Sequence, residues 1–374
     1  MHKPNLRALR LVAAVSLAAA AALALGSDVI VQAAGKPAGL TTRVFATGGA
    51  LGNGVTVSKP DDITQLGGSI FVAWQNGVGS QGEPNGSVQD SSVVQYSWAG
   101  QILDSWQLTG RVDGMSADPD NSRILATVNE DGNTSLYIVR PNASPVAQLT
   151  HYAYSPDPPV HGGGTDAPHV YRGRIFISAS NPSDSTQPAL YSVSLSGTTA
   201  TLAPVFYDDS TARVANTDDA AFGTAVTLAL TDPDSNTVVP GSSPRFGGDF
   251  LLDSQGDGQL IYARDAGTAR QELWVLNLSS VAGLAGASTA VDDTVWATAS
   301  RGTLFATDGS NTIYAIAGAF EVGTAYSAVT PGNANTPSGM ANFLAILNLS
   351  TGELTAVPSV TISPKGLLFV AGQG

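Results

Sequence analysis

The sequence of 374 residues contains no cysteine, and only 13% of its residues are charged. The absence of cysteine excludes disulfide bonds, thiolate-bound zinc and lipid attachment through a thiol, so the fold depends on its hydrophobic core. The sequence also lacks the phosphate-binding patterns GxGxxG before a helix and GxxxxGK[ST], so nucleotide binding has no support. The little charge present is one-sided, because 30 acidic residues oppose 17 basic ones.

The first 33 residues have the pattern of an export signal. Three basic residues precede an apolar, Ala-rich run at 11–25, and small residues then predict cleavage after Ala33. Residues 24–26 offer an alternative cleavage site, and an uncleaved anchor is the competing interpretation, although the apolar run is short for a membrane span. We expect a protein that is secreted, periplasmic or held at the cell surface.

Removal of residues 1–33 leaves 14 basic and 29 acidic residues, which is a net charge of −15. Such a charge opposes binding to nucleic acid and to anionic lipid, and it favours cations. The soluble surface of an exported protein is the simpler explanation. We expect a monomer whose partner is a small molecule, a cation or an extracellular protein.

One short pattern occurs six times: a turn rich in Gly, Asp or Pro, followed by an apolar run of β-forming residues. The runs begin at Ile70, Ile124, Ile175, Leu260, Leu304 and Leu367, at intervals of 54, 51, 85, 44 and 63 residues. Other strand-like segments lie between the copies, so each unit is expected to contain four antiparallel strands, as a propeller blade does. The sequence predicts an all-β, six-bladed β-propeller, and a two-sheet sandwich is the alternative.

The propeller is predicted to be a single domain over residues 34–374. The longest interval predicts a polar insertion at 208–245 in the fourth blade, interpreted as a surface loop or hairpin. The last copy is incomplete because only four residues follow Val370. Strands at 41–49 and 54–58 are therefore expected to complete the last blade and to close the ring.

Aspartates precede five of the six apolar runs, at the place where a blade's innermost strand is expected to begin at one mouth of the central channel. They are Asp62, Asp113, Asp166, Asp249 and Asp293. Converging carboxylates need a cation, a basic partner or backbone N–H donors, and oxygen ligands suit Ca²⁺ or another divalent cation. These residues are therefore candidate metal ligands, and capping of a repeated turn by each Asp is the competing interpretation.

The stretch at 151–169 contains three of the four histidines and the sequence HGGG. His151, His161 and His169 are spaced more widely than the histidines of zinc motifs. HGGG occurs in the oxyanion loop of α/β-hydrolases, but the GxSxG elbow that this chemistry needs is absent. We expect a loop between blades, with His169 near the channel mouth either as an acid/base candidate or as a structural residue.

Residues 112–131, VDGMSADPDNSRILATVNED, resemble a blade of the regucalcin/gluconolactonase-like propellers. Residues 59–77, KPDDITQLGGSIFVAWQNG, are a looser copy that is also similar to NHL repeats. The whole chain resembles exported bacterial propellers of unassigned function. The resemblance implies that Asp113 is a metal ligand and an acid/base residue, whereas no position matches the family's other ligands, one Glu and two Asn.

Two functions remain open on these observations. The favoured one is a propeller that binds a ligand, a cation or a protein partner at its acidic mouth without chemistry. The alternative is a metal-dependent hydrolase or lactonase that uses Asp113 and the neighbouring aspartates.

Overall fold

β-Strands make up nearly all the regular structure in the part of the chain that the structure describes. The computed structural model describes residues 39–159, 164–182, 186–282, 289–331 and 341–372. These ranges contain no α-helix and two short 3₁₀ turns, η1 (Pro119–Asn121) and η2 (Pro145–Ala147), and none of their helical segments could span a membrane. The described residues belong to one unit, 34–374, and the predicted export signal at 1–33 lies outside them.

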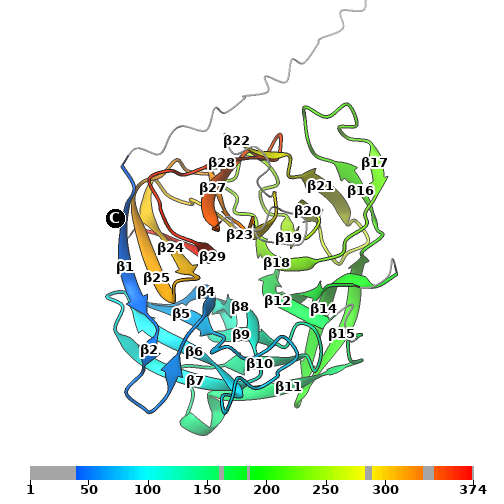
Figure 1. Ribbon diagram of the computed structural model, residues 1–374. Coiled ribbons are helices and arrows are strands. Elements are labelled where there is room, and N and C mark those ends of the chain that lie inside the picture. Colours follow the sequence, from blue (N-terminus) through cyan, green and yellow to red (C-terminus); the bar gives the residue numbers. More distant parts are fainter. Residues whose placement is uncertain (1–38, 160–163, 183–185, 283–288, 332–340, 373–374) are drawn as a thin grey trace, which may run out of the picture. The chain divides into compact units, whose positions relative to one another are not determined.

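Six strands lie closest to a central axis (Figure 1). They are β4 (Pro60–Leu66), β8 (Val112–Asp118), β12 (Gly164–Tyr171), β18 (Pro233–Val238), β23 (Val291–Trp296) and β29 (Pro364–Ala371). Within the described part of the chain each strand contacts the next in this order, and β29 contacts β4. The order is therefore closed, which gives an all-β, propeller-like arrangement.

The first three innermost strands are each followed outward by three antiparallel strands. These are β5 (Ser69–Trp74), β6 (Asp90–Ser97) and β7 (Ile102–Thr109) after β4; β9 (Arg123–Val128), β10 (Ser135–Val139) and β11 (Leu149–Ser155) after β8; and β13 (Arg174–Ser180), β14 (Pro188–Ser196) and β15 (Thr199–Tyr207) after β12. In these groups the apolar run is the second strand, as the repeat predicts. The outermost strands β11 and β15 also pair in parallel, which joins two groups into one sheet.

The fourth group corrects the interpretation of residues 208–245 as a surface loop or hairpin. From the axis outward it contains β18, β19 (Phe250–Ser254), β20 (Gln259–Arg264) and β21 (Glu272–Asn277), with β16 (Thr211–Val214) and β17 (Ala225–Thr227) at its outer edge. The innermost strand β18 thus lies inside the supposed insertion. Its sequence, PDSNTV, is polar because the strand faces the axis rather than a hydrophobic core.

The last two groups exchange strands. One contains β23, β26 (Ala325–Val329), β27 (Phe343–Leu347), β28 (Glu353–Ala356) and β22 (Ser280–Ala282), and the other contains β29, β24 (Arg301–Asp308), β25 (Thr312–Ala319) and β1 (Thr41–Thr47). After β23 the chain leaves to form β24 and β25, returns for three strands, and ends in β29. The runs at Leu304 and Leu367 are therefore neighbouring strands of one sheet, not successive copies of one blade position.

The amino-terminal strand completes the sheet that contains the carboxy-terminal strand. β1 pairs antiparallel with β25, so residues from both ends of the unit share one sheet, as predicted. The second expected segment behaves differently, because β3 (Thr56–Val57) pairs with β2 (Gly49–Ala50) in a separate two-stranded ribbon.

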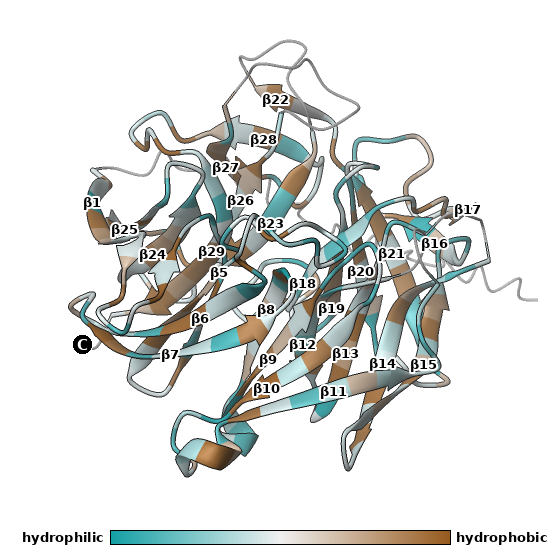
Figure 2. Cartoon of the chain, turned by 60° about the horizontal axis from the view of Figure 1, so that its bottom comes forward, coloured by the Kyte–Doolittle hydropathy of each residue, from teal (hydrophilic) through white to brown (hydrophobic). Residues whose placement is uncertain are grey.

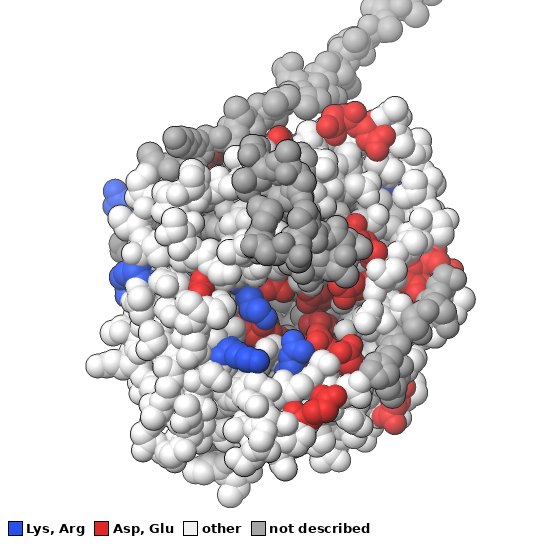
Figure 3. Space-filling model, viewed as in Figure 1, with Lys and Arg blue, Asp and Glu red and all other residues white. Residues whose placement is uncertain are grey.

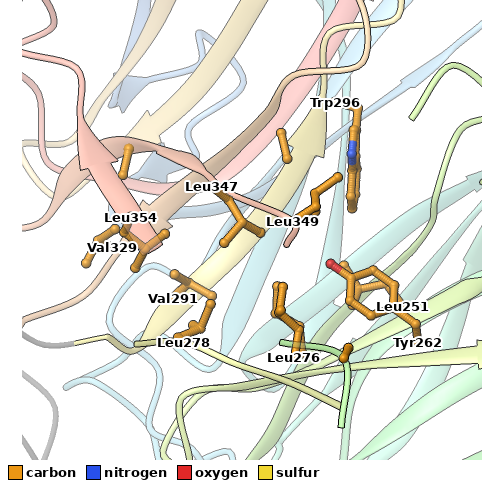
Figure 4. Close-up of a cluster of buried hydrophobic side chains, with 14 of the residues drawn as sticks. Leu251, Tyr262, Leu276, Leu278, Val291, Trp296, Val329, Leu347, Leu349 and Leu354 are labelled. Atoms are coloured by element: carbon orange, nitrogen blue, oxygen red, sulfur yellow. The ribbon is translucent and has the colours of Figure 1, made fainter. Parts of the chain in front are cut away.

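The hydrophobic core of the described residues consists of six clusters, each between two neighbouring strand groups. Figure 2 shows hydrophobic segments within the strands and hydrophilic segments in many of the loops. In the cluster of Figure 4, Leu251 and Tyr262 from the fourth group face Trp296 and Leu347 from the next. Burial of each such side chain stabilises the folded state by about 1.5–3 kcal/mol. Because the core lies between the strand groups, the residues at the central axis can be polar.

Candidate functional site

The innermost strands enclose an axial cavity of about 520 Å³. Each strand contributes residues of one four-residue window to the lining. The windows are 61–64, 113–116, 166–169, 234–237, 292–295 and 365–368. Figure 3 shows acidic side chains in the central hollow and to its right, and basic side chains to its left.

Every window begins where the innermost strand shifts register against its neighbour. A bulge of this kind re-aims a side chain, and here it places a charged residue at the cavity. We call the six residues at the bulges the charged ring. They are Asp61, Asp113, Asp166, Asp234, Asp292 and Lys365.

Hydroxyl groups on the second strands show that the ring positions are equivalent. Thr127 Oγ1 accepts a hydrogen bond from the backbone N–H of Gly114 at 3.2 Å, and donates one to the carbonyl oxygen of Asp166 on the next innermost strand. The same pair of contacts is made by Ser178 to Ala167 and Asp234, and by Thr307 to Gly366 and Asp61. Each hydroxyl therefore fixes one bulge against the next.

Four of the five predicted aspartates line the cavity. Two of them belong to the charged ring, and the other two, Asp62 and Asp293, come one residue later. Asp62 Oδ2 accepts the backbone N–H of Met115 at 2.5 Å, and Asp293 Oδ2 accepts that of Leu367 at 2.7 Å. These two carboxylates hold adjacent innermost strands together through backbone N–H donors.

Asp249 is the exception, because it lies outside the cavity. It precedes β19, the second strand of its group, is 4% exposed, and lies 3.6 Å from Arg264. Its expected place at the channel mouth needs correction, since β18 occupies the innermost position and Asp234 is the residue equivalent to the other ring members.

Four members of the charged ring are missing from the predicted set. Asp61 and Asp292 stand beside predicted aspartates in Asp-Asp pairs, and spacing alone cannot choose between adjacent residues. Asp234 lies in the polar segment taken for a loop, although its β-branched continuation at 237–239 indicates a strand. Lys365 departs from the pattern because it is the one ring position that has no carboxylate.

Two cationic side chains are already paired on one side of the cavity. Arg111 bridges two carboxylates, with its Nε 2.9 Å from Asp113 and its Nη1 2.8 Å from Glu130. Lys365 Nζ lies 2.7 Å from Asp61 Oδ1. Because Asp113 also accepts hydrogen bonds from Gln75 and from the backbone N–H of Glu130, its oxygens are engaged by the protein itself.

The opposite side of the cavity has carboxylates that form no ion pair among the described residues: Asp166, Asp232, Asp234 and Asp292. Burial and the neighbouring carboxylates raise the pKa of Asp166 and Asp234 well above the usual range. The same causes raise the pKa of Asp232 to about 6. Burial also raises the pKa of Asp292, although Lys365 offsets part of this effect. We call these four residues the unpaired cluster.

Three side chains at or beside the unpaired cluster have buried polar atoms without hydrogen-bond partners among the described residues: Asn236 at its Oδ1, Asp253 and Thr330. Asp253 on β19 is 1% exposed and neither carboxylate oxygen has a partner. Its pKa is raised well above the usual range by burial and by Asp293, Asp292 and Asp232, so it lies within their electrostatic reach. Thr330 lines the cavity, is 7% exposed, and its hydroxyl also has no partner.

The last residues of the six windows form a floor of mixed polarity, three residues beyond the charged ring. They are Thr64, Ser116, His169, Thr237, Val295 and Leu368. His169 Nδ1 lies 3.3 Å from Ser116 Oγ, and burial lowers the pKa of His169 to about 4. The imidazole is therefore neutral at pH 7, and its contact with Ser116 is a structural hydrogen bond. An acid/base role for His169 stays a prediction.

The other predicted histidines are not at the cavity. His151 lies on β11, where its ring is 4.6 Å from that of Tyr137, and His161 lies outside the described residues. Within the described ranges no three His, Asp or Glu side chains form a group that could hold a metal ion.

No protein-family model matches the sequence, and no curated protein matches it. Solved structures with a similar arrangement include a protein from Lactobacillus plantarum, at 12% identity and a TM-score of 0.45, covering 85% of this chain and 90% of that chain. A periplasmic gluconolactonase from Pseudomonas aeruginosa has 16% identity, a TM-score of 0.45 and the same coverage. A candidate 6-phosphogluconolactonase from Bacteroides uniformis has 14% identity and a TM-score of 0.44, covering 84% of this chain and 91% of that chain.

Gluconolactonase-like proteins thus occur among the structural neighbours, in agreement with the resemblance seen in the sequence. Identities of 12–16% and TM-scores of 0.45 or below carry no argument about activity. What this cavity does must be inferred from its own residues.

Proposed function

We propose that the protein is a six-bladed β-propeller that binds a cationic ligand in its axial cavity. The observation that carries the proposal is the unpaired cluster, whose four carboxylates face the cavity without an ion pair. Like charges gathered in a partly desolvated site raise the free energy of the ionised state. A bound cation removes this cost, so the cavity favours cations over neutral or anionic ligands.

Topology and sequence support the blade count and the export of the protein. The closed order of six innermost strands supports a count of six blades, with the fifth and sixth exchanging strands. The pattern of residues 1–33 supports export of the mature domain. A cavity of this kind then meets ligands outside the cytoplasm.

Binding without chemistry is favoured over lactone hydrolysis by the surroundings of Asp113. A metal ligand needs free carboxylate oxygens, and those of Asp113 are engaged by Arg111, by Gln75 and by a backbone N–H. We therefore place the cation at the unpaired cluster, on the other side of the cavity. Ca²⁺ is one candidate occupant and an organic cation is another.

The proposal is tested by melting temperature at pH 8 and constant ionic strength, with CaCl₂ or butylammonium chloride added after treatment with EDTA. A ligand present at 100 times its Kd stabilises the folded state by about 2.7 kcal/mol. We expect at least one of the two cations to raise the melting temperature. In Asp234→Asn the apparent affinity for that cation, derived from the rise in melting temperature, should be at least about tenfold weaker.

The matched control is Asp120→Asn, which neutralises an exposed aspartate of η1 that is not part of the cavity lining. It should leave the response unchanged. Absence of stabilisation by both cations would overturn cation binding, as would an equal loss in the control variant.

A further inference from the structure

The axial cavity is large compared with a metal ion. Its volume of about 520 Å³ falls within the range of small-molecule sites, about 300–1,000 Å³. A divalent metal ion needs several oxygen ligands at about 2.0–2.6 Å, and the described residues form no such group. The volume of the cavity and the separation of its carboxylates both suit a cation larger than a metal ion.

Buried polar atoms of the cavity lining have no hydrogen-bond partners among the described residues. A buried polar atom without a hydrogen bond costs several kcal/mol, yet Asn236 Oδ1 and Thr330 Oγ1 are both in this state. Both residues belong to the cavity lining, whereas Asp253, whose oxygens also lack partners, does not. Hydrogen-bond donors on a ligand would satisfy such acceptors, and an ammonium group carries up to three of them.

The floor of the cavity is apolar on one side only. Val295 and Leu368 come from the neighbouring strands β23 and β29, and both are half-buried at the cavity. Val295 lies three residues beyond Asp292 on the same strand, a separation of about 10 Å. The remaining floor positions present hydroxyl and imidazole groups. A ligand that reaches from the unpaired cluster to this apolar side must have a hydrocarbon part.

We propose that the cavity takes an organic ammonium ion, with its nitrogen among Asp166, Asp234 and Asp292 and its hydrocarbon chain extending along β23 to Val295 and Leu368. This inference rests on the proposed cation binding and specifies the class of the cation. The carboxylates supply charge and acceptors, and the two aliphatic side chains supply the surface that an inorganic ion cannot use.

The test is calorimetric titration with ammonium, methyl-, butyl- and hexylammonium chloride and with CaCl₂, at constant ionic strength and pH 8. Each methylene that becomes buried should tighten binding by about threefold to fourfold. Wild-type protein should therefore bind hexylammonium at least about 30 times more tightly than methylammonium. Asp234→Asn should weaken the whole series.

Val295→Thr keeps the shape of the side chain and makes it polar, so it should weaken hexylammonium binding most and flatten the dependence on chain length. The matched control is Val44→Thr, which makes the same change at an exposed site on β1 and should change nothing. Binding of ammonium or Ca²⁺ with no dependence on chain length would overturn this inference and leave the proposed cation site intact. No binding by any of these cations would overturn both.

Discussion

Lys365 Nζ lies 2.7 Å from Asp61 Oδ1, and this ion pair joins the last innermost strand to the first. Lys365 is the one cationic member of the charged ring, where the other five members are aspartates. The pair therefore has two roles, because it closes the order of innermost strands and offsets part of the negative charge of the cavity.

These two roles predict opposite effects of Lys365→Gln. Loss of the ion pair should lower the free energy of unfolding by about 1–3 kcal/mol, because Asp61 is left half-buried without a charge partner. Loss of the positive charge should also tighten binding of a cation in the cavity, by about threefold to tenfold. Chemical denaturation and calorimetric titration of one variant measure both effects, and a change of binding in the same direction as stability would contradict this account.

Asp234→Asn should have the reverse pair of effects. Removing one of the four charges of the unpaired cluster relieves repulsion, so the melting temperature without ligand should rise at pH 8 by about 1–4 °C. Binding of any cation should weaken in the same variant. Differential scanning fluorimetry at low salt checks the first effect, with Asp120→Asn as the control that should leave the melting temperature unchanged.

The pH dependence of stability follows from the same carboxylates. Burial raises the pKa of Asp293 to about 7 and that of Asp232 to about 6, above the value of about 3.9 for an unfolded chain. The folded state therefore holds more protons between about pH 4 and pH 7, and stability falls as the pH rises through this window. His169 acts in the opposite direction, since its lowered pKa of about 4 makes stability fall as the pH drops below about 6.5.

The carboxylates outnumber the single histidine, so the net expectation is a melting temperature that declines between pH 5 and pH 8 in the absence of ligand. The slope for one carboxyl is at most about 1.4 kcal/mol per pH unit. Asp293→Asn should reduce the decline, and a bound cation should reduce it further. A melting temperature that rises steadily across this range would show that the cavity carboxylates titrate normally.

Close approach of the innermost strands makes Gly114 intolerant of a side chain. A Cβ atom at this position would lie 2.2 Å from Cα of Ala167 on the next innermost strand, and such a clash requires a backbone shift. Gly114→Ala should destabilise the protein by about 1–3 kcal/mol or more. Gly241→Ala is the matched control, because no atom lies within 4 Å of a Cβ there, and equal denaturation midpoints for the two variants would refute the contact.

The repeated pattern of a turn and an apolar run predicted two members of the charged ring, Asp113 and Asp166. Their blades follow the simple order of an innermost strand, a turn and an apolar run. The pattern predicted Asp62 and Asp293 instead of their neighbours Asp61 and Asp292. The position of a β-bulge within an innermost strand decides between adjacent residues, and the spacing of the repeats does not reveal it. The pattern misplaced Asp249 because the polar strand β18 has the composition of a loop.

Other parts of the site depend on contacts between residues far apart in the chain. The pairing of Arg111 with Glu130 and of Lys365 with Asp61 cannot be read from composition or periodicity. The closure by β1 was predictable, since an incomplete last copy needs strands from the other end of the chain.

The exchange of strands between the last two groups has a consequence for how the protein is made. Synthesis proceeds from the amino terminus, and domains begin to fold as they emerge from the ribosome. β24 and β25 are synthesised before β26, β27 and β28, but the strand beside β24 on the axial side is β29, which is synthesised after all three. The nascent chain must therefore hold an unfinished sheet edge at β24 until β29 has been made, and the cavity wall gains its lysine only with that strand.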